Sequence, residues 1–348
     1  MKRKNFILGL ILSLLTALLL TCVYGAITKT GPFAEKKETP GFLEDSTSRP
    51  PETSSGPEPE EEVADPFPMY DRAKDETFTL DGHELLPAAI ACEMDLHAPE
   101  EALKAQAVAC YTLFCRKRAN GEAIACDPEQ WQVWTNEEHM RARWGQDYEG
   151  TIAALRSIVD QVYGEVILYE DEPILAAYTA ISPGSTEDGA LLWRRSYSYL
   201  RPVASPGDRF ADGYLTVLSM TEKEFKEKLN QQSTVEGLKA DGKAGAWLTD
   251  ISYTQSGTVE HAVLCGVTVT GQELRAIFSL PAASFSVEHT DGGFTFTVRG
   301  RGHGVGLSQA GAVFFAKRGM GYEEILKHYY PGTELGALPK EEHPPETD

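Results

Sequence analysis

The strongest constraint on this chain is an apolar segment near its N-terminus. Residues 6–24 form an uncharged run of 19 residues, preceded by Lys2, Arg3 and Lys4. A helix rises about 1.5 Å per residue, so the run matches the ~30 Å hydrocarbon core of a bilayer. The basic end predicts a cytoplasmic N-terminus and an extracytoplasmic remainder. We therefore expect residues 1–27 to be a single-pass membrane anchor.

Two other interpretations of this segment stay open. A cleaved signal peptide has a shorter apolar core and a small-x-small cleavage site. The best candidate site here, residues 24–26, places Tyr24 where a small side chain is needed. Acylation at Cys22 is the third interpretation, although Leu-Leu-Thr is a poor sequence before a lipidated cysteine.

The ends of the remaining chain have compositions that disfavour folding. Residues 28–66 hold seven Pro and ten acidic residues with almost no aromatic side chains. Such a segment buries too little apolar surface to offset the entropy of ordering. We expect a disordered linker at residues 28–66, a globular domain at residues 67–335 and a flexible acidic tail at residues 336–348.

The acidic balance excludes some classes of function. The chain has 32 basic and 52 acidic residues, a formal net charge of −20. A general nucleic-acid binder needs a basic face, and so does a protein that docks electrostatically on anionic lipid. Five cysteines outside the apolar segment, an odd number without regular spacing, do not indicate a disulfide framework.

The globular part is predicted to be α+β, with helices first and strands later. Apolar spacing and end signals predict helices at residues 85–96, 99–120, 148–162, 308–317 and 322–329. Strands are expected at residues 166–169, 174–179, 263–269, 284–289 and 293–299, the first two paired around Asp171-Glu172-Pro173.

One carboxylate and one glycine-rich segment are candidates for chemistry. Glu93 lies in an apolar stretch, where burial raises the pKa of a Glu and keeps it available as an acid near neutral pH. A surface Glu or a helix cap is the plainer interpretation. Residues 300–311, GRGHGVGLSQAG, let the backbone approach a ligand closely, or form a tight turn without one. This segment fits neither a dinucleotide fingerprint nor a P-loop, and it is one residue short of a serine-hydrolase elbow.

A third candidate is the polar segment 182–186, followed by Trp193. Hydroxyl groups with aromatic side chains suit a sugar-binding cleft, but a polar turn that leads to a core Trp has the same composition. The histidines are scattered and no paired metal-binding motif is present, so no metal is expected.

Several blocks resemble the stage II sporulation protein D family (the SpoIID/LytB domain). Glu93-Met94 with EALKAQAVA at residues 101–109 is similar to its first block, and GHGVGLSQ at 302–309 with Gly311-Ala312 to its second. YEEILKHYYPGT at 322–333 is similar to its closing segment. The resemblance runs from about residue 80 to 335, so residues 67–335 are expected to form a SpoIID/LytB-like catalytic domain.

The resemblance implies a peptidoglycan lytic transglycosylase that acts during engulfment in sporulation. Glycan strands without stem peptides are its implied substrate, cleaved between N-acetylmuramic acid (MurNAc) and N-acetylglucosamine (GlcNAc) to 1,6-anhydroMurNAc ends. The family's catalytic residue falls on Glu93, which acts as acid and then as base. Substrate binding is expected from the hydroxyl, amide and imidazole groups of Gln106, Ser182, Thr186, His303, Ser308 and Gln309.

The same resemblance implies partners and a place in the cell. The partners are the amidase stage II sporulation protein P and the scaffold stage II sporulation protein M. The domain is expected outside the cytoplasm, between mother cell and forespore. No cofactor is expected, and no zinc is predicted, because the segment 126–132 keeps only Cys126 of the Cys, His and Cys ligands that some members have.

The sequence departs from the family at positions that keep another class of function open. Asp95 stands where Pro is common, Arg301 replaces a common Trp, and Pro183 and Ser185 interrupt a Ser-Gly-Gly-x-Thr loop. The alternative is therefore a non-catalytic module that binds peptidoglycan or activates an amidase. A purely structural bridge between two membranes is a third hypothesis.

Overall fold

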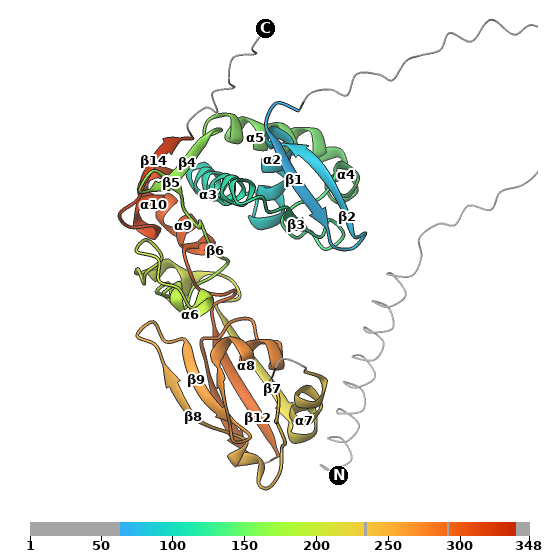
Figure 1. Ribbon diagram of the computed structural model, residues 1–348, viewed down its shortest axis with the longest axis vertical. Coiled ribbons are helices and arrows are strands. Elements are labelled where there is room, and N and C mark those ends of the chain that lie inside the picture. The colour runs from blue at the N-terminus through green and yellow to red at the C-terminus, as the bar shows by residue number, and fades with distance from the viewer. Residues whose placement is uncertain (1–62, 233–234, 291, 339–348) are drawn as a thin grey trace, which may run out of the picture. The chain divides into compact units, whose positions relative to one another are not determined.

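The computed structural model describes residues 63–232, 235–290 and 292–338, which all belong to one compact unit, Glu61–Asp348 (Figure 1). The expected anchor at 1–27, the expected linker up to residue 62 and the expected tail from residue 339 lie outside the described residues. Within the described part, no helix combines the length and apolar character needed to cross a membrane. The fold is α+β, as the sequence predicts, but two strands, Pro66–Asp71 and Glu76–Asp81, precede the first described helix, so the predicted order of helices first and strands later is wrong.

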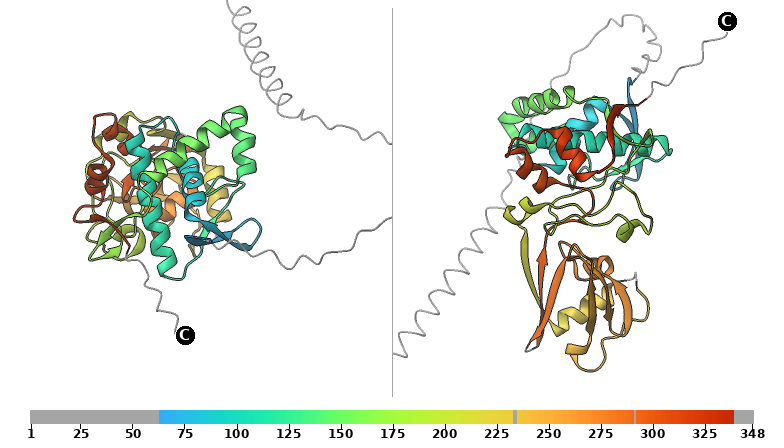
Figure 2. Two further views of the ribbon diagram at one scale, coloured as in Figure 1. Left: turned by 90° about the horizontal axis from the view of Figure 1, so that it is seen from above. Right: turned by 90° about the vertical axis from the view of Figure 1, so that its left-hand side faces the viewer.

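The first hydrophobic core is built around α2 (Gly82–Glu93), α3 (Glu100–Ala119) and α5 (Tyr148–Asp160), which pack on one another. Four of the buried residues of α3 are alanines, whose small side chains allow close packing. Figure 2 shows the same helices from two further sides. Asp65, at the end of the expected linker, accepts hydrogen bonds from Tyr111 on α3 and from Tyr163. The folded part therefore begins just before residue 66.

Shorter elements surround these helices. They are β1 (Pro66–Asp71), β2 (Glu76–Asp81), β3 (Ile124–Cys126), α4 (Glu137–Trp144), β4 (Glu165–Tyr169), β5 (Glu172–Pro173), β6 (Tyr178–Thr179), α6 (Ala190–Trp193), β13 (Leu307–Ser308), α9 (Gln309–Ala316), α10 (Tyr322–Tyr329) and β14 (Glu334–Ala337). The strand orders are β2-β1-β3 and β14-β4-β5, and β6 pairs with β13 in parallel.

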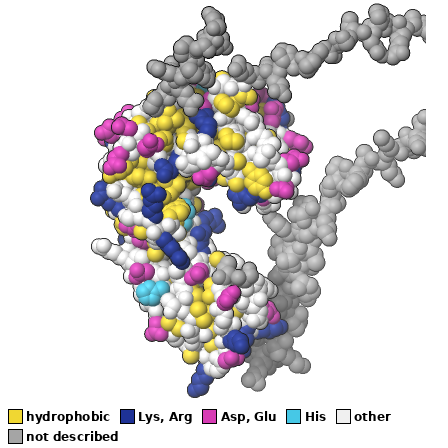
Figure 3. Space-filling view, in the orientation of Figure 1, with side chains coloured by type: hydrophobic (Ala, Val, Ile, Leu, Met, Phe, Trp, Pro, Cys, Tyr) yellow, Lys and Arg dark blue, Asp and Glu magenta, His cyan; other side chains and the backbone are white. Residues whose placement is uncertain are grey.

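A second core forms from the chain between β6 and β13. In it the Phe225 ring stacks on Phe294 and lies tilted against Phe278. Its elements are β7 (Leu215–Thr221), α7 (Glu222–Gln231), β8 (Leu248–Tyr253), β9 (Val259–Leu264), β10 (Val267–Thr270), α8 (Gly271–Phe278), β11 (Phe285–Thr290) and β12 (Gly293–Arg299), in sheets β10-β9-β8 and β11-β12-β7. On the face drawn in Figure 3, side chains of both charges are interspersed over both cores.

Three predicted elements differ from the structure for local reasons. Helix α2 begins at Gly82, not residue 85, because the Asp81 side chain accepts the amide of His83 as an N-cap. Glu170 and Asp171 both have positive φ, so a tight hairpin pairs β4 with β5 and leaves only Tyr178–Thr179 of the predicted 174–179 strand. A turn at Cys265-Gly266, again with positive φ, splits the predicted 263–269 strand into β9 and β10.

Candidate active site

Glu93 is the last residue of α2, and its position there follows from how the helix ends. The Met94 amide donates to the Ile90 carbonyl at 2.9 Å, and Met94 itself is extended, so the chain leaves the helix directly after Glu93. The C-terminal end of a helix carries a partial negative charge, which disfavours a carboxylate. Glu93 is therefore placed where its neutral form is favoured.

The amide side chain of Gln309 hydrogen-bonds the Glu93 carboxyl group, and that of Gln106 supports Gln309. Gln309 Nε2 donates to Glu93 Oε2 at 3.5 Å and to Gln106 Oε1 at 3.3 Å. Gln106 Nε2 in turn donates to Cys110 Sγ at 3.2 Å, one turn further along α3. Gln106 is fully buried and Gln309 nearly so. Three of the residues selected from the sequence, Glu93, Gln106 and Gln309, thus form one hydrogen-bonded row.

Burial raises the pKa of Glu93, and hydrogen bonds from Gln309 and Tyr178 oppose that rise. The net direction is upward, as expected for a carboxyl group that serves as an acid. Burial and the neighbouring Glu93 together raise the pKa of the Cys92 thiol to about 12. Cys92 therefore stays a thiol near neutral pH and adds no charge beside Glu93.

Tyr178 is a site residue that the sequence did not reveal. It lies in β6, whose parallel pairing with β13 sets Tyr178 opposite Leu307, next to Ser308 and Gln309. Its side chain hydrogen-bonds the carboxyl group of Glu93, and burial raises its own pKa well above the usual value. A neutral tyrosine donates its hydroxyl proton, so Tyr178 stabilises the Glu93 carboxylate. No local signal distinguishes this tyrosine from others in strands.

Asp208 joins three segments of the chain behind the Glu93 row. Its Oδ2 accepts the Ser182 amide at 2.7 Å and the Ser308 hydroxyl at 2.8 Å, and Asp208, Ser182 and Ser308 are all fully buried. Burial raises the Asp208 pKa, while the hydrogen bonds from Ser182 and Ser308 oppose the rise. Ser308 also caps α9 by accepting the Gly311 amide. Asp208 thereby fixes Ser308, the residue that precedes Gln309, and none of the sequence patterns above pointed to it.

The other selected residues lie further from Glu93 in the hydrogen-bond pattern. Thr186 is fully buried, where its Oγ1 accepts the Val203 amide at 2.9 Å. The Ser182 hydroxyl accepts the Gly184 amide at 3.2 Å. As arranged, the hydroxyls of Ser182, Thr186 and Ser308 bond to the chain itself and shape the loops.

His303 is neutral and touches the site through Tyr178. Burial and the charge of Arg275 lower the pKa of His303 to about 4. A hydrogen bond to the Tyr178 backbone acts in the opposite direction, to raise that pKa. Its Nδ1 accepts the Val305 amide at 3.1 Å, which leaves the proton on Nε2. The ring also meets Trp193 edge to face. His303 therefore orders the glycine-rich segment against β6.

Glu93 and Gln309 open onto a pocket of about 490 Å³. Phe210 and Phe314 line it as a parallel pair, 6.2 Å between ring centroids and 8° between planes. Phe210 is 80% exposed, so one aromatic face is free, and the guanidinium of Arg318 lies over Phe314 at 3.4 Å. An acid beside a free aromatic face suits a ring-shaped ligand with polar edges.

No group of three His, Cys, Asp or Glu side chains is arranged to hold a metal ion among residues 63–232, 235–290 and 292–338. Cys126 packs in the first core, where burial raises its thiol pKa to about 11. A zinc ligand must be a thiolate, so this position suits a core residue. All five described cysteines are free thiols.

Comparison with known proteins shows the family of this chain. The family model described as "Stage II sporulation protein" (SpoIID) matches residues 70–169, which contain Glu93 and Gln106. Stage II sporulation protein D of Bacillus subtilis is 31% identical over 77% of this chain and 78% of that protein. The protein of the same name from Bacillus amyloliquefaciens is 30% identical with the same coverage. The amidase enhancer of B. subtilis is 26% identical over 72% of this chain and 40% of that protein. The chain belongs to the stage II sporulation protein D (SpoIID) family.

Proposed function

We propose that the protein is a membrane-anchored lytic transglycosylase that cleaves MurNAc–GlcNAc bonds of peptide-stripped peptidoglycan strands during sporulation engulfment. The observation that carries this proposal is the state of Glu93: one partly buried carboxyl group of raised pKa, held by Gln309 and Tyr178 at the wall of a pocket. Family membership supports the sporulation role.

The first step needs an acid. Neutral Glu93 donates its proton to the glycosidic oxygen, the C1–O bond of MurNAc breaks, and GlcNAc leaves with its hydroxyl restored. Positive charge develops at C1, and the new Glu93 carboxylate faces it. Hydrogen bonds from Gln309 and Tyr178 stabilise that carboxylate as it forms.

The second step needs a base, and the same residue supplies it. The Glu93 carboxylate takes the proton of the MurNAc C6 hydroxyl while the C6 oxygen bonds to C1, which closes the 1,6-anhydro ring and restores neutral Glu93. A hydrolase of the usual kind needs a second carboxylate as nucleophile or base. The other pocket acids, Asp95 and Asp212, are exposed, and hydrogen bonds from His97 lower the Asp95 pKa. The site therefore suits one residue in two roles.

The test is a digest of amidase-treated glycan strands, analysed by mass spectrometry. We expect 1,6-anhydroMurNAc ends from the wild type and none from Glu93→Gln. Glu84→Gln is the matched control, since Glu84 is exposed at the other end of α2. Ordinary reducing ends, or full activity in Glu93→Gln, would refute the proposal.

The similarity to the amidase enhancer favours a second candidate, a non-catalytic module that binds peptidoglycan or activates an amidase. Under that hypothesis, denuded strands co-sediment with the wild type without being cleaved, and the rate of an added amidase rises. Glu93→Gln would then leave both properties unchanged.

Anchoring and partners are part of the proposal. The apolar run at residues 6–24 supports a single-pass anchor with the domain outside the cytoplasm. We expect the full chain to resist alkaline extraction from membranes and to become soluble when residues 1–27 are deleted. Affinity purification from sporulating cells should recover stage II sporulation proteins P and M; recovery of neither would refute the partnership.

A further inference from the structure

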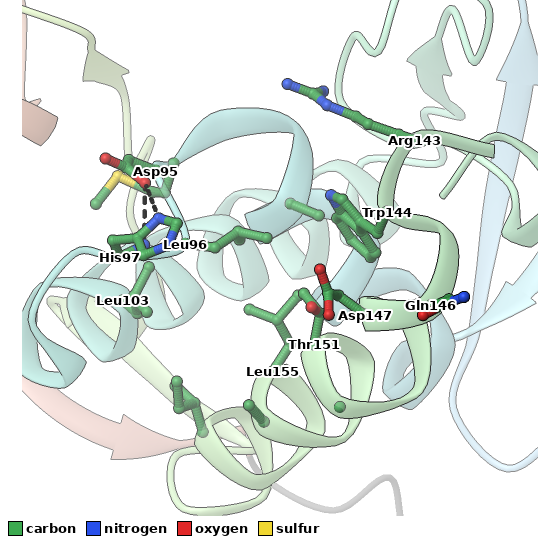
Figure 4. Close-up of a pocket in the computed structure, with 15 residues that line it drawn as sticks. Asp95, Leu96, His97, Leu103, Arg143, Trp144, Gln146, Asp147, Thr151 and Leu155 are labelled. Carbon is green, nitrogen blue, oxygen red and sulfur yellow. Dashed lines mark hydrogen bonds and ion pairs between the residues drawn. The ribbon is translucent and has the colours of Figure 1, made fainter. Parts of the chain in front are cut away.

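A second and larger pocket lies beside the one that holds Glu93. Its volume is about 800 Å³, and Figure 4 shows Trp144, Asp147 and Leu155 on one side of the opening and Leu96 and His97 on the other. Met94 and Asp95 line both pockets. The two pockets are therefore neighbours that share the residues directly following Glu93.

The lining of this pocket suits a neutral, polyhydroxylated ligand. Trp144 is partly exposed and offers aromatic surface to the apolar face of a sugar ring. Asp147, Gln146 and Thr151 add groups that hydrogen-bond hydroxyls. The carboxylates of Asp95 and Asp147 make the lining acidic, which disfavours an anionic peptide.

The cation in this lining is already engaged. The guanidinium of Arg143 lies over the Trp131 ring at 4.3 Å. It is therefore poorly placed to pair with a ligand carboxylate in the pocket.

A glycine, Gly150, forms part of the pocket wall. It lies in the first turns of α5, is exposed and lines the pocket, yet a Cβ there would meet no atom within 4 Å. A glycine inside a helix lowers its stability relative to alanine, and here no packing contact requires one. Gly150 therefore leaves this wall of the pocket without a side chain, and there is open space beside it for a larger one.

We propose that the second pocket is a saccharide-binding subsite that holds the glycan strand beyond the sugars next to Glu93. The proposal rests on the proposed function, because it takes the strand cleaved at Glu93 as its ligand. A strand held in both pockets passes over Met94 and continues on either side of the cleaved bond. The protein should therefore cut at internal bonds as well as at strand ends.

The test places a large side chain at Gly150 so that it occupies the second pocket. Gly150→Trp places a ring over the hollow, and Gly150→Ala is the matched control at the same position. For long peptide-free strands, we expect Gly150→Trp to lower kcat/KM about tenfold, which corresponds to about 1.4 kcal/mol. Cleavage of a tetrasaccharide, which offers few sugars beyond those next to the cleaved bond, should stay at the wild-type rate in both variants. Thermal unfolding checks that both variants fold.

Three results would overturn the proposal. They are an equal loss on long and short substrates, no loss on either, and a loss confined to strands that carry stem peptides. If the wild type cleaves nothing, the proposed function fails, but the subsite is still tested by binding. In the Glu93→Gln background, Gly150→Trp should then weaken co-sedimentation with long peptide-free strands, and Gly150→Ala should not; equal binding by the two would refute the subsite.

Discussion

Replacing Asp208 with alanine removes the acceptor that joins three segments of the chain behind Glu93. The Ser182 amide and the Ser308 hydroxyl, both fully buried, lose their bond to Asp208 Oδ2. A buried donor left without a partner costs about 1–3 kcal/mol, so the two together should cost about 3 kcal/mol or more. For a domain of this size, 1 kcal/mol lowers the unfolding temperature by about 2–4 °C, which gives a decrease of about 6–12 °C.

Asp208→Asn is the matched control, because its amide oxygen can still accept both bonds. Calorimetry should show a decrease several-fold smaller than for Asp208→Ala. Since burial raises the Asp208 pKa above its ordinary 3.8, its contribution to stability is present below that pH and is lost as pH rises through the folded-state pKa. The asparagine side chain does not ionise, so the stability of this variant relative to the wild type should increase as pH rises. Equal unfolding temperatures for the two variants would refute this reasoning.

Three further predictions concern the pocket itself. Glu93→Gln should stabilise the fold at neutral pH, because the raised pKa of Glu93 means that its ionisation lowers the stability of the wild type as pH rises. In calorimetry, the difference in unfolding temperature from the wild type should vanish below about pH 4.5, the ordinary pKa of a Glu. Tyr178→Phe removes a hydrogen bond that lowers the Glu93 pKa, so the alkaline limb of the kcat/KM profile should move to higher pH; a move to lower pH would contradict this role. Phe210→Ala should raise KM for glycan several-fold with a stability change within about 0.5 kcal/mol, since the ring is 80% exposed, whereas Leu215→Ala, also exposed, should leave KM unchanged.

Elements with strong local signals were predictable to within a few residues. Helix α3 follows Pro99 and ends before Asn120-Gly121, α5 starts at Tyr148, and α10 matches its predicted bounds. In each, apolar periodicity agrees with signals at the ends. The predicted strand at 293–299 is β12 for the same reason, as an alternating run bounded by glycines.

The sequence predicted a hairpin after residue 169 but not that its turn is Glu170-Asp171, and the two-residue pairing of β6 with β13 was beyond sequence reasoning. The hairpin depends on positive φ at two non-glycine residues, Glu170 and Asp171. Strand β6 pairs with β13, and the whole second core lies between them in the sequence. Residues so far apart in the chain carry no spacing signal. For the same reason, no pattern in residues 215–299 predicted that they build a hydrophobic core of their own.

The sequence by itself determined the α+β class, the acidic and non-basic character, and the choice of Glu93, Gln106 and Gln309, through local composition and resemblance to a family. Only the tertiary structure decided that these three side chains touch, that Tyr178 joins them, and that Ser182, Thr186 and Ser308 bond to the chain. It also decided that Asp208 connects the loops behind them and that a second pocket continues from Met94. Residue type fixes what a side chain can do, but packing decides which neighbours and how much water it meets, and these set its pKa and its access to a ligand.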